Sequence, residues 1–256
     1  MGLTIHFGLS LAAETPESEA RATLAAVREA ALDMPFQIVT DLVRVTRDDI
    51  EAFALEEASN HIELEKLVGI MAENLAEDLV RVRQGIEIVD GVYPHIELPD
   101  DLTITAIAFA AMPGEGCEPA ILGLAKVDAE EFSSPWSWHG FCKTQYASAE
   151  GDEHFLKCHR SVIELLDAAQ RIGIQCEVND EGGFYEARDA AQLLAEVDKM
   201  NRLIAHFAGR LSDMFEERLG DNRAVEAEIF HHPDFERLET RGLDPLDFGG
   251  SGPTSR

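Results

Sequence analysis

The stretch LTIHFGLSL, residues 3–11, decides the fold class, because its apolar side chains occupy every second position. This period of two predicts a β-strand with one buried face and one more polar face. Thr15 and Pro16 then predict the start of a helix that runs to about Leu32. A second strand is predicted over 36–46, so the chain is expected to open with a β-α-β unit. The inner face of this helix is expected to hold Leu24, Val27 and Ala31.

Two apolar runs in the middle of the chain predict a β-hairpin. Residues 102–112 and 120–127 are almost continuously apolar, and PGEGCEP, residues 113–119, joins them. Short apolar runs bounded by turn residues are consistent with strands that are buried on both faces.

Two more β segments are predicted beyond this hairpin. Residues 136–147 have an extended pattern, and residues 174–178 and 184–186 flank NDEGG, residues 179–183. Asn, Asp and paired Gly residues favour tight turns, so the second of these segments is expected to be a hairpin.

Apolar residues with helical spacing predict the remaining helices. The expected helices cover 48–59 (with an Asp48–Glu51 capping box), 64–82, 153–172 and a long segment that begins after Asp189. Gly85 and Gly173 are expected to end two of them. The predicted inner stripe of the helix over 64–82 is Leu64, Leu67, Val68, Met71, Leu75, Leu79 and Val82. The stripe of the last helix is Leu193, Val197, Met200, Ile204, Phe207, Leu211 and Met214.

Together these elements predict an α+β fold in which amphipathic helices pack on a mixed sheet. A single domain over 1–248 is expected, with a sub-boundary near 128–135 and a disordered tail over 249–256. No run of apolar residues is long enough for a membrane-spanning helix.

The charge of the chain restricts its partners. Against 49 acidic residues there are only 21 Lys and Arg, which gives a formal net charge of −28. Such a surface disfavours nucleic acids and anionic membranes, which bind through Lys and Arg. Residues 48–78 contain ten acids and one base, Lys66, and are either a solvated face or a docking site for a basic protein. The long amphipathic helices are also compatible with a homodimer.

The cysteines indicate a reducing compartment. Four widely spaced residues, without a CxxC pair, favour a cytoplasmic protein whose thiols are free. Zinc binding by Cys142, His154 and Cys158 is conceivable, but the helical pattern favours packing for the last two, so no metal and no cofactor are expected. A short cluster at 231–234, HHPD, is expected to be incidental.

The densest set of reactive side chains lies between 138 and 188. In it, Cys142 could serve as a nucleophile, His159 or His154 as its base, and Asp180 or Glu181 as the group that orients the base. The remaining polar residues of this region are candidates for ligand binding: Thr144, Gln145, Tyr146, Glu181, Tyr185 and Arg188.

Three segments carry a resemblance to a known family. WSWHGFCKTQYAS at 136–148, PGEGCEP at 113–119 and DEGGFYEARD at 180–189 look like the signature segments of an uncharacterised bacterial protein family. The resemblance extends from Thr4 to about Leu211 and implies one integral bacterial fold. It implies no activity, because the family has none assigned.

Two functional hypotheses follow from the sequence. The first is a cytosolic binding or regulatory protein, which the acidic stretch and the amphipathic helices favour. The alternative is a small-molecule enzyme, such as a hydrolase, with its site between the Cys142 segment, the helix over 153–172 and the Asp180 hairpin. A concave pocket that brings Cys142, His159 and Asp180 together would favour the enzyme.

Overall fold

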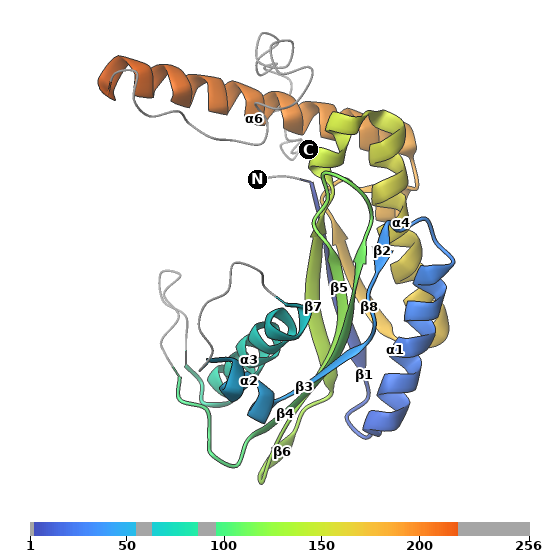
Figure 1. Cartoon of the computed structure of the whole chain (residues 1–256), viewed down its shortest axis with the longest axis vertical. Helices are drawn as coiled ribbons and strands as arrows, with labels where there is room; N and C mark the ends of the chain where they lie inside the picture. The colour runs from blue at the N-terminus through green and yellow to red at the C-terminus, as the bar shows by residue number, and fades with distance from the viewer. Residues whose placement is uncertain (1–2, 55–62, 87–95, 220–256) are drawn as a thin grey trace, which may run out of the picture.

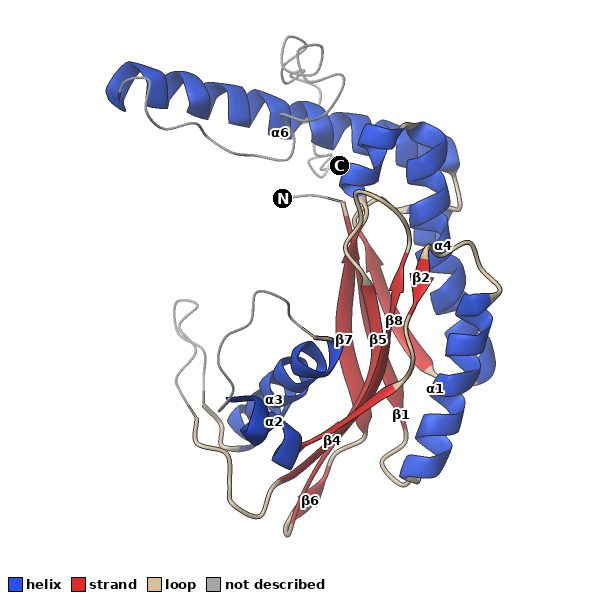
Figure 2. Ribbon diagram, in the orientation of Figure 1, coloured by secondary structure: helices blue, strands red, loops and turns tan. Residues whose placement is uncertain are grey.

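The computed structural model describes residues 3–54, 63–86 and 96–219, and it consists of a sheet with helices on both faces (Figures 1 and 2). The strands are β1 (Thr4–Leu11), β2 (Ile38–Val39), β3 (Val43–Thr46), β4 (Thr103–Met112), β5 (Ala120–Ala129), β6 (Phe132–Ser133), β7 (Trp136–Lys143) and β8 (Gln175–Asp180). The helices are α1 (Glu17–Leu32), α2 (Arg47–Ala54), α3 (Leu64–Arg83), η1 (a 3-10 helix, Gln145–Glu150), α4 (Asp152–Ile172), α5 (Phe184–Ala187) and α6 (Ala190–Leu219). The α+β class and the β1-α1-β2 opening are confirmed.

The sheet has eight strands in the order β2-β4-β5-β7-β1-β8, with β3 also paired to β4 and β6 to β5. Every pairing between described strands is antiparallel, so the expectation of a mixed sheet is wrong. The reason lies in the opening unit. Strands β1 and β2 run in the same direction, but β7, β5 and β4 lie between them and separate them in the sheet.

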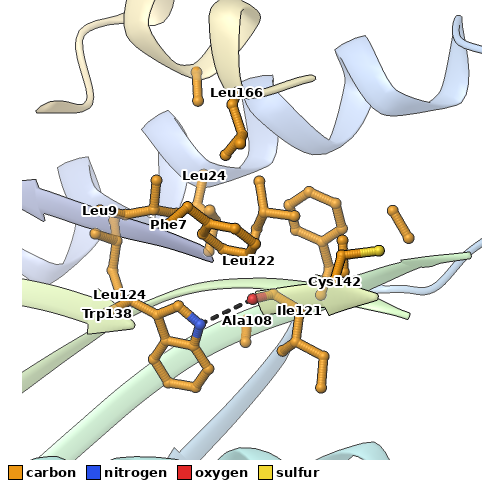
Figure 3. Packing of buried hydrophobic residues seen from close by; sticks show 14 of the residues in the cluster. Phe7, Leu9, Leu24, Ala108, Ile121, Leu122, Leu124, Trp138, Cys142 and Leu166 are labelled. Carbon is orange, nitrogen blue, oxygen red and sulfur yellow. Dashed lines mark hydrogen bonds between the residues drawn. The ribbon is translucent and has the colours of Figure 1, made fainter. Parts of the chain in front are cut away.

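The core lies between the sheet and helices α1 and α4, which cover one of its faces (Figure 1). Phe7 and Leu9 of β1 and Leu122 of β5 pack there against Leu24 of α1 and Leu166 of α4 (Figure 3). The predicted inner face of α1 is therefore confirmed, since its three residues are fully buried. On the other face of the sheet, α2 and α3 lie over the end formed by β3 and β4. Helix α6 contacts α4 and α5 and runs past the opposite end of the sheet (Figure 1).

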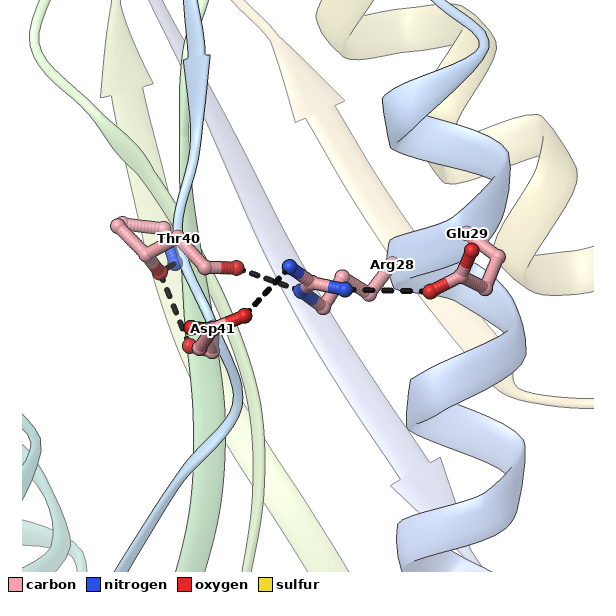
Figure 4. Close-up of polar contacts among 5 residues, drawn as sticks. Arg28, Glu29, Thr40 and Asp41 are labelled. Carbon is pink, nitrogen blue, oxygen red and sulfur yellow. Dashed lines mark hydrogen bonds and ion pairs between the residues drawn. The ribbon is translucent and has the colours of Figure 1, made fainter.

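The predicted strand over 36–46 is divided into β2 and β3 by a polar contact. The Arg28 Nε–H donates to the Thr40 carbonyl (2.6 Å), and a second guanidinium nitrogen reaches Asp41 (2.8 Å; Figure 4). The Thr40 hydroxyl accepts the N–H of Ala110 (2.9 Å), so that a side chain replaces the backbone partner at this point of the ladder.

Two local predictions are corrected. The predicted hairpin around 179–183 does not form, because β8 pairs with β1 and residues 184–187 form the short helix α5. The capping box of α2 is formed by Thr46 and Asp49 rather than by Asp48 and Glu51. The backbone N–H and the hydroxyl of Thr46 both donate to the Asp49 carboxylate, at 2.8 and 2.6 Å.

Helix α6 is only partly packed. Leu193 and Val197 are buried as expected, whereas Phe207 keeps 57% of its surface exposed, because α6 continues beyond the sheet (Figure 1). Val82 of α3 is also exposed. The side chains of Leu211 and Met214, the predicted end of a helix at 59, the HHPD cluster and the tail lie outside what the structure describes. No helix among the described residues is long and apolar enough to cross a membrane.

Close contact between β1 and β7 depends on Gly140. A Cβ atom at this position would lie 2.5 Å from the ring of Phe7 and 2.9 Å from the carbonyl oxygen of Ile121. At Gly8, on the neighbouring strand, the nearest atom to such a Cβ would be 3.6 Å away, which is an ordinary contact.

We therefore expect Gly140→Ala to lower the free energy of unfolding by about 1–3 kcal/mol, because the buried ring and the backbone must move. The matched variant Gly8→Ala should change it by less than about 0.5 kcal/mol. Urea denaturation of both variants measures the difference. Equal stability of the two variants would contradict the close packing of β1 on β7.

Candidate functional site

Three of the predicted site residues meet in a buried polar network. His159 of α4 lies between Thr144, which follows β7, and Asp180, the last residue of β8. The Thr144 hydroxyl is 2.9 Å from Nδ1 of His159, and Nε2 is 3.2 Å from a carboxylate oxygen of Asp180. The side chains of His159 and Asp180 have no exposed surface, and Thr144 is fully buried. The network thus ties α4 to two strands of the sheet.

The Asp180 carboxylate is also the acceptor for two backbone groups. Its oxygens accept the N–H groups of Gly182 and Tyr185, each at 2.9 Å. Burial alone would raise the pKa of Asp180, but the hydrogen bond and charge of His159 and the two N–H groups outweigh it, so the pKa is lowered. Because an ionised carboxylate only accepts hydrogen bonds, Nε2 of His159 carries a proton.

Cys142 does not join this network. Its thiol is buried and donates to the carbonyl oxygen of Glu118 (3.0 Å), and burial raises its pKa well above the ordinary range. Both ring nitrogens of His159 are engaged with Thr144 and Asp180. The structure therefore brings two of the three catalytic candidates together, and their complete burial favours a packing role over contact with a substrate.

Gln145 belongs to a second buried network, which holds α6 against the sheet. Its side-chain oxygen accepts the N–H of Leu3 (3.1 Å), and its amide nitrogen donates to Asn201 of α6 (2.8 Å). Asn201 in turn donates to the hydroxyl of Ser148 (2.9 Å). The extended segment, predicted over 136–147, ends at Lys143. Gln145 and Ser148, which form this network, lie in η1 instead.

The other ligand-binding candidates lie at the surface, where neighbouring side chains or backbone groups engage them. Arg188 forms two hydrogen bonds of 2.8 Å with Asp167, and its guanidinium lies over the ring of Tyr185. The carboxylate of Glu181 accepts the N–H of Thr4 (2.9 Å), and the ammonium of Lys143 lies over the ring of Tyr146. These contacts join neighbouring elements and leave no convergent group of free donors among these residues.

A different surface, which we call the open face, consists of the exposed side chains of His6, His139, Phe141, Glu177 and Asn179. They alternate along β1, β7 and β8 with residues that are buried or half-buried on the side of α1 and α4. Antiparallel pairing sets Phe141 opposite His6 and His139 opposite Gly8. A hollow of about 300 Å³ lies over Gly8, which has no side chain to fill it, and the backbone of Gly140 also borders this hollow.

Phe141 also borders an apolar hollow of about 280 Å³ between α3 and the sheet. Its lining consists of Leu67, Met71, Glu118, Pro119, Ile121 and Phe141. The ring of Phe141 keeps 52% of its surface exposed, and its centroid is 6.3 Å from that of His6. Phe141 is not among the site residues predicted from the sequence. Its position is nevertheless a signal, because it is the apolar residue among the otherwise polar outward positions of β7.

The chain has no match among protein-family models, curated proteins or solved structures. The resemblance to a bacterial family therefore stays a prediction. Within the described ranges, no group of three or more His, Cys, Asp and Glu side chains is arranged to hold a metal ion.

Asp180→Asn tests the role of the buried network. The side chain of Asn has one acceptor oxygen, whereas the two oxygens of Asp180 accept hydrogen bonds from His159 and from two backbone N–H groups. At least one of these donors is therefore left unpaired in the variant. We expect the free energy of unfolding at pH 7 to fall by about 1–3 kcal/mol. Asp100→Asn, at an exposed position before β4, is the control and should be neutral.

The same variant makes a pH-dependent prediction. Because the Asp180 pKa is lowered in the folded protein, its carboxylate stabilises the fold above the ordinary Asp pKa of about 4 and loses this effect at lower pH. The stability difference between wild type and Asp180→Asn should therefore shrink below about pH 4. A difference that is independent of pH would contradict an ionised Asp180.

Proposed function

We propose that the protein is a binding protein that takes a basic protein segment with an apolar anchor on its open face and in the adjoining apolar hollow. The observation that carries the proposal is the half-exposed ring of Phe141, which stands on an otherwise polar strand face beside the hollow. Aromatic side chains in such positions often supply most of the binding energy of an interface.

The apolar hollow supports an anchor of the size of one large side chain. Leu67 and Met71 of α3 and Ile121 of β5 form its walls together with Phe141. Complete burial of a Leu or Phe side chain contributes about 1.5–3 kcal/mol. An anchor of that kind would bury the exposed part of Phe141 at the same time.

Charge supports a basic partner. Glu118 borders the apolar hollow, and Glu177 borders the hollow over Gly8. The formal net charge of −28 attracts cationic segments and repels anionic ones. The proposal thus connects the open face with the acidic stretch over 48–78, to which α3 belongs.

Several acids of this stretch already have partners within the chain. Asp49 caps α2, Glu51 pairs with Arg47, and both Glu77 and Asp78 pair with Arg81. Among the described acids of this stretch, Glu63 and Glu65, near the beginning of α3, are exposed and take part in none of these contacts. We therefore assign the docking role to the beginning of α3 rather than to the whole stretch.

The alternative function, a small-molecule enzyme such as a hydrolase, is less favoured, because His159 and Asp180 are completely buried. We further propose a cytoplasmic location, which the four free thiols support. Self-association through the exposed side of α6 around Phe207 is the second interaction that we propose.

Selection from a random peptide library on the purified protein tests the proposed function. The enriched peptides should combine Lys or Arg with a single Leu, Phe or Trp. Their affinity, measured by fluorescence anisotropy, should fall about tenfold or more in Phe141→Ala, which corresponds to about 1.4 kcal/mol. Leu32→Ala, an exposed apolar residue at the end of α1, is the matched control and should bind like wild type.

Charge provides the second readout. The affinity of a selected peptide should fall with rising salt, and a version with Glu in place of Lys and Arg should not bind. Enrichment without basic residues, or unchanged binding to Phe141→Ala, would overturn the proposed function.

A further inference from the structure

A gap among the side chains of the open face lies at Gly8 of β1. Gly8 is paired with His139 of β7 on one side and with Glu177 of β8 on the other. An imidazole and a carboxylate therefore flank a position without a side chain. We call this hollow of about 300 Å³ the Gly8 slot. The side chains that line it on the open face are those of His6, His139, Glu177 and Asn179.

The strand spacing sets the width of the slot. Neighbouring strands lie about 4.7–4.9 Å apart, so the backbones of β7 and β8 are about 9–10 Å apart across β1. Two hydrogen bonds of about 2.9 Å take up roughly 6 Å of this width. The remaining distance, about 3–4 Å, accommodates one flat head group that forms hydrogen bonds with both walls.

The polar groups of the walls are available to a ligand. Within the described ranges, no hydrogen bond or ion pair engages the side chains of His139, Glu177 and Asn179. The ring of His139 leans toward the slot, because its Nδ1 and Cε1 would lie 3.6 Å from a Cβ atom at Gly8. A carboxylate, an amide oxygen and an imidazole nitrogen, all hydrogen-bond acceptors, thus surround one glycine.

The charge around the slot favours a cation. Glu177 lines the slot, and Glu181 lies 3.7 Å from His6 at its end. No Lys or Arg of the described chain lines the slot. Together with the formal net charge of −28, these carboxylates repel an anionic ligand.

We propose that the Gly8 slot binds the guanidinium group of an arginine in the basic segment, an inference that rests on the proposed function. A guanidinium is flat, and its five N–H donors point outward in one plane. Lying on the glycine floor, it pairs with the carboxylate of Glu177. It also donates to the side-chain oxygen of Asn179 and to the ring nitrogen of His139.

The same geometry discriminates against lysine. An ammonium is a compact, strongly hydrated point charge, and it lacks the planar fork that reaches two walls at once. A lysine in the slot would therefore leave acceptors of one wall without a donor. The proposal narrows the basic partner to one that contains an arginine at this position.

The slot and the apolar hollow also fix a spacing in the partner. Phe141, which borders the apolar hollow, follows His139 by two residues on β7 and faces the same side of the sheet. Both sites thus belong to one hydrogen-bonded sheet. An extended segment that occupies both should carry its arginine and its apolar anchor at a constant separation.

Gly8 offers a variant that closes the slot and leaves the sheet intact. The nearest atoms to a Cβ at this position would be the His139 ring at 3.6 Å and the Cβ of Glu177 at 3.8 Å, which are ordinary contacts. The methyl group of Gly8→Ala would instead stand on the floor of the slot. Glu177→Gln is the second variant and removes the ion pair.

The matched control for charge is Glu19→Gln. Glu19 is exposed on α1, which covers the opposite side of the sheet, and this variant changes the net charge as Glu177→Gln does. Urea denaturation verifies that each variant is folded.

The first experiment uses a single-residue probe, so its result does not depend on a peptide or on the apolar hollow. The full-length protein is titrated with N-acetyl-arginine amide or N-acetyl-lysine amide, and the histidine ring signals are followed by NMR. We expect saturable shifts of the His6 and His139 signals with the arginine probe and about tenfold weaker binding of the lysine probe. Glu19→Gln should behave like wild type, whereas Gly8→Ala and Glu177→Gln should each weaken the arginine probe about tenfold.

The second experiment replaces the arginine of a selected peptide by lysine. The replacement should weaken binding to wild type about tenfold and should have little effect on binding to Gly8→Ala. Equal binding of the two probes to wild type, or a Gly8→Ala variant that binds the arginine probe like wild type, would overturn the proposal. Peptides that depend on Phe141 but show no preference for arginine would overturn the slot alone and leave the proposed function intact.

Discussion

The register of β1 between β7 and β8 is the constraint on which the rest of the structure depends. Ile5 pairs with Cys142 on one side and with Asp180 on the other, so the same three-strand layer fixes one buried and one open side. A shift by one residue would turn Phe7 and Leu9 to solvent and His6 into the core. The buried side holds the His159 network beneath α4, while the open side presents Phe141 and His139.

The loop between β4 and β5 connects the open face with α4. Its carbonyl oxygen at Glu115 lies 3.0 Å from Nε2 of His154 in α4, and Glu118 and Pro119 border the apolar hollow. The chain thus combines a sheet, which sets the shape of the open face, with a loop that links the apolar hollow to α4.

Local sequence patterns predicted those helices and strands whose own residues have a clear helical or strand periodicity. Alternation along residues 3–11 and helical spacing in α1 and α4 gave elements that the structure confirms, as did the apolar runs of β4 and β5. Non-local pairing could not be predicted in this way: the turn residues at 179–183 do not reveal that β8 pairs with β1, at the other end of the chain. Nor does the pattern show that Phe141 is left outside.

The central claim is that the open face is accessible in the protein while the opposite face is sealed. Acylation of histidines by diethyl pyrocarbonate, followed residue by residue by mass spectrometry, tests it on the unmodified chain. The account predicts that His6 and His139 react in the folded protein, whereas His159 reacts only after unfolding. Protection of His6 and His139 equal to that of His159 would contradict it.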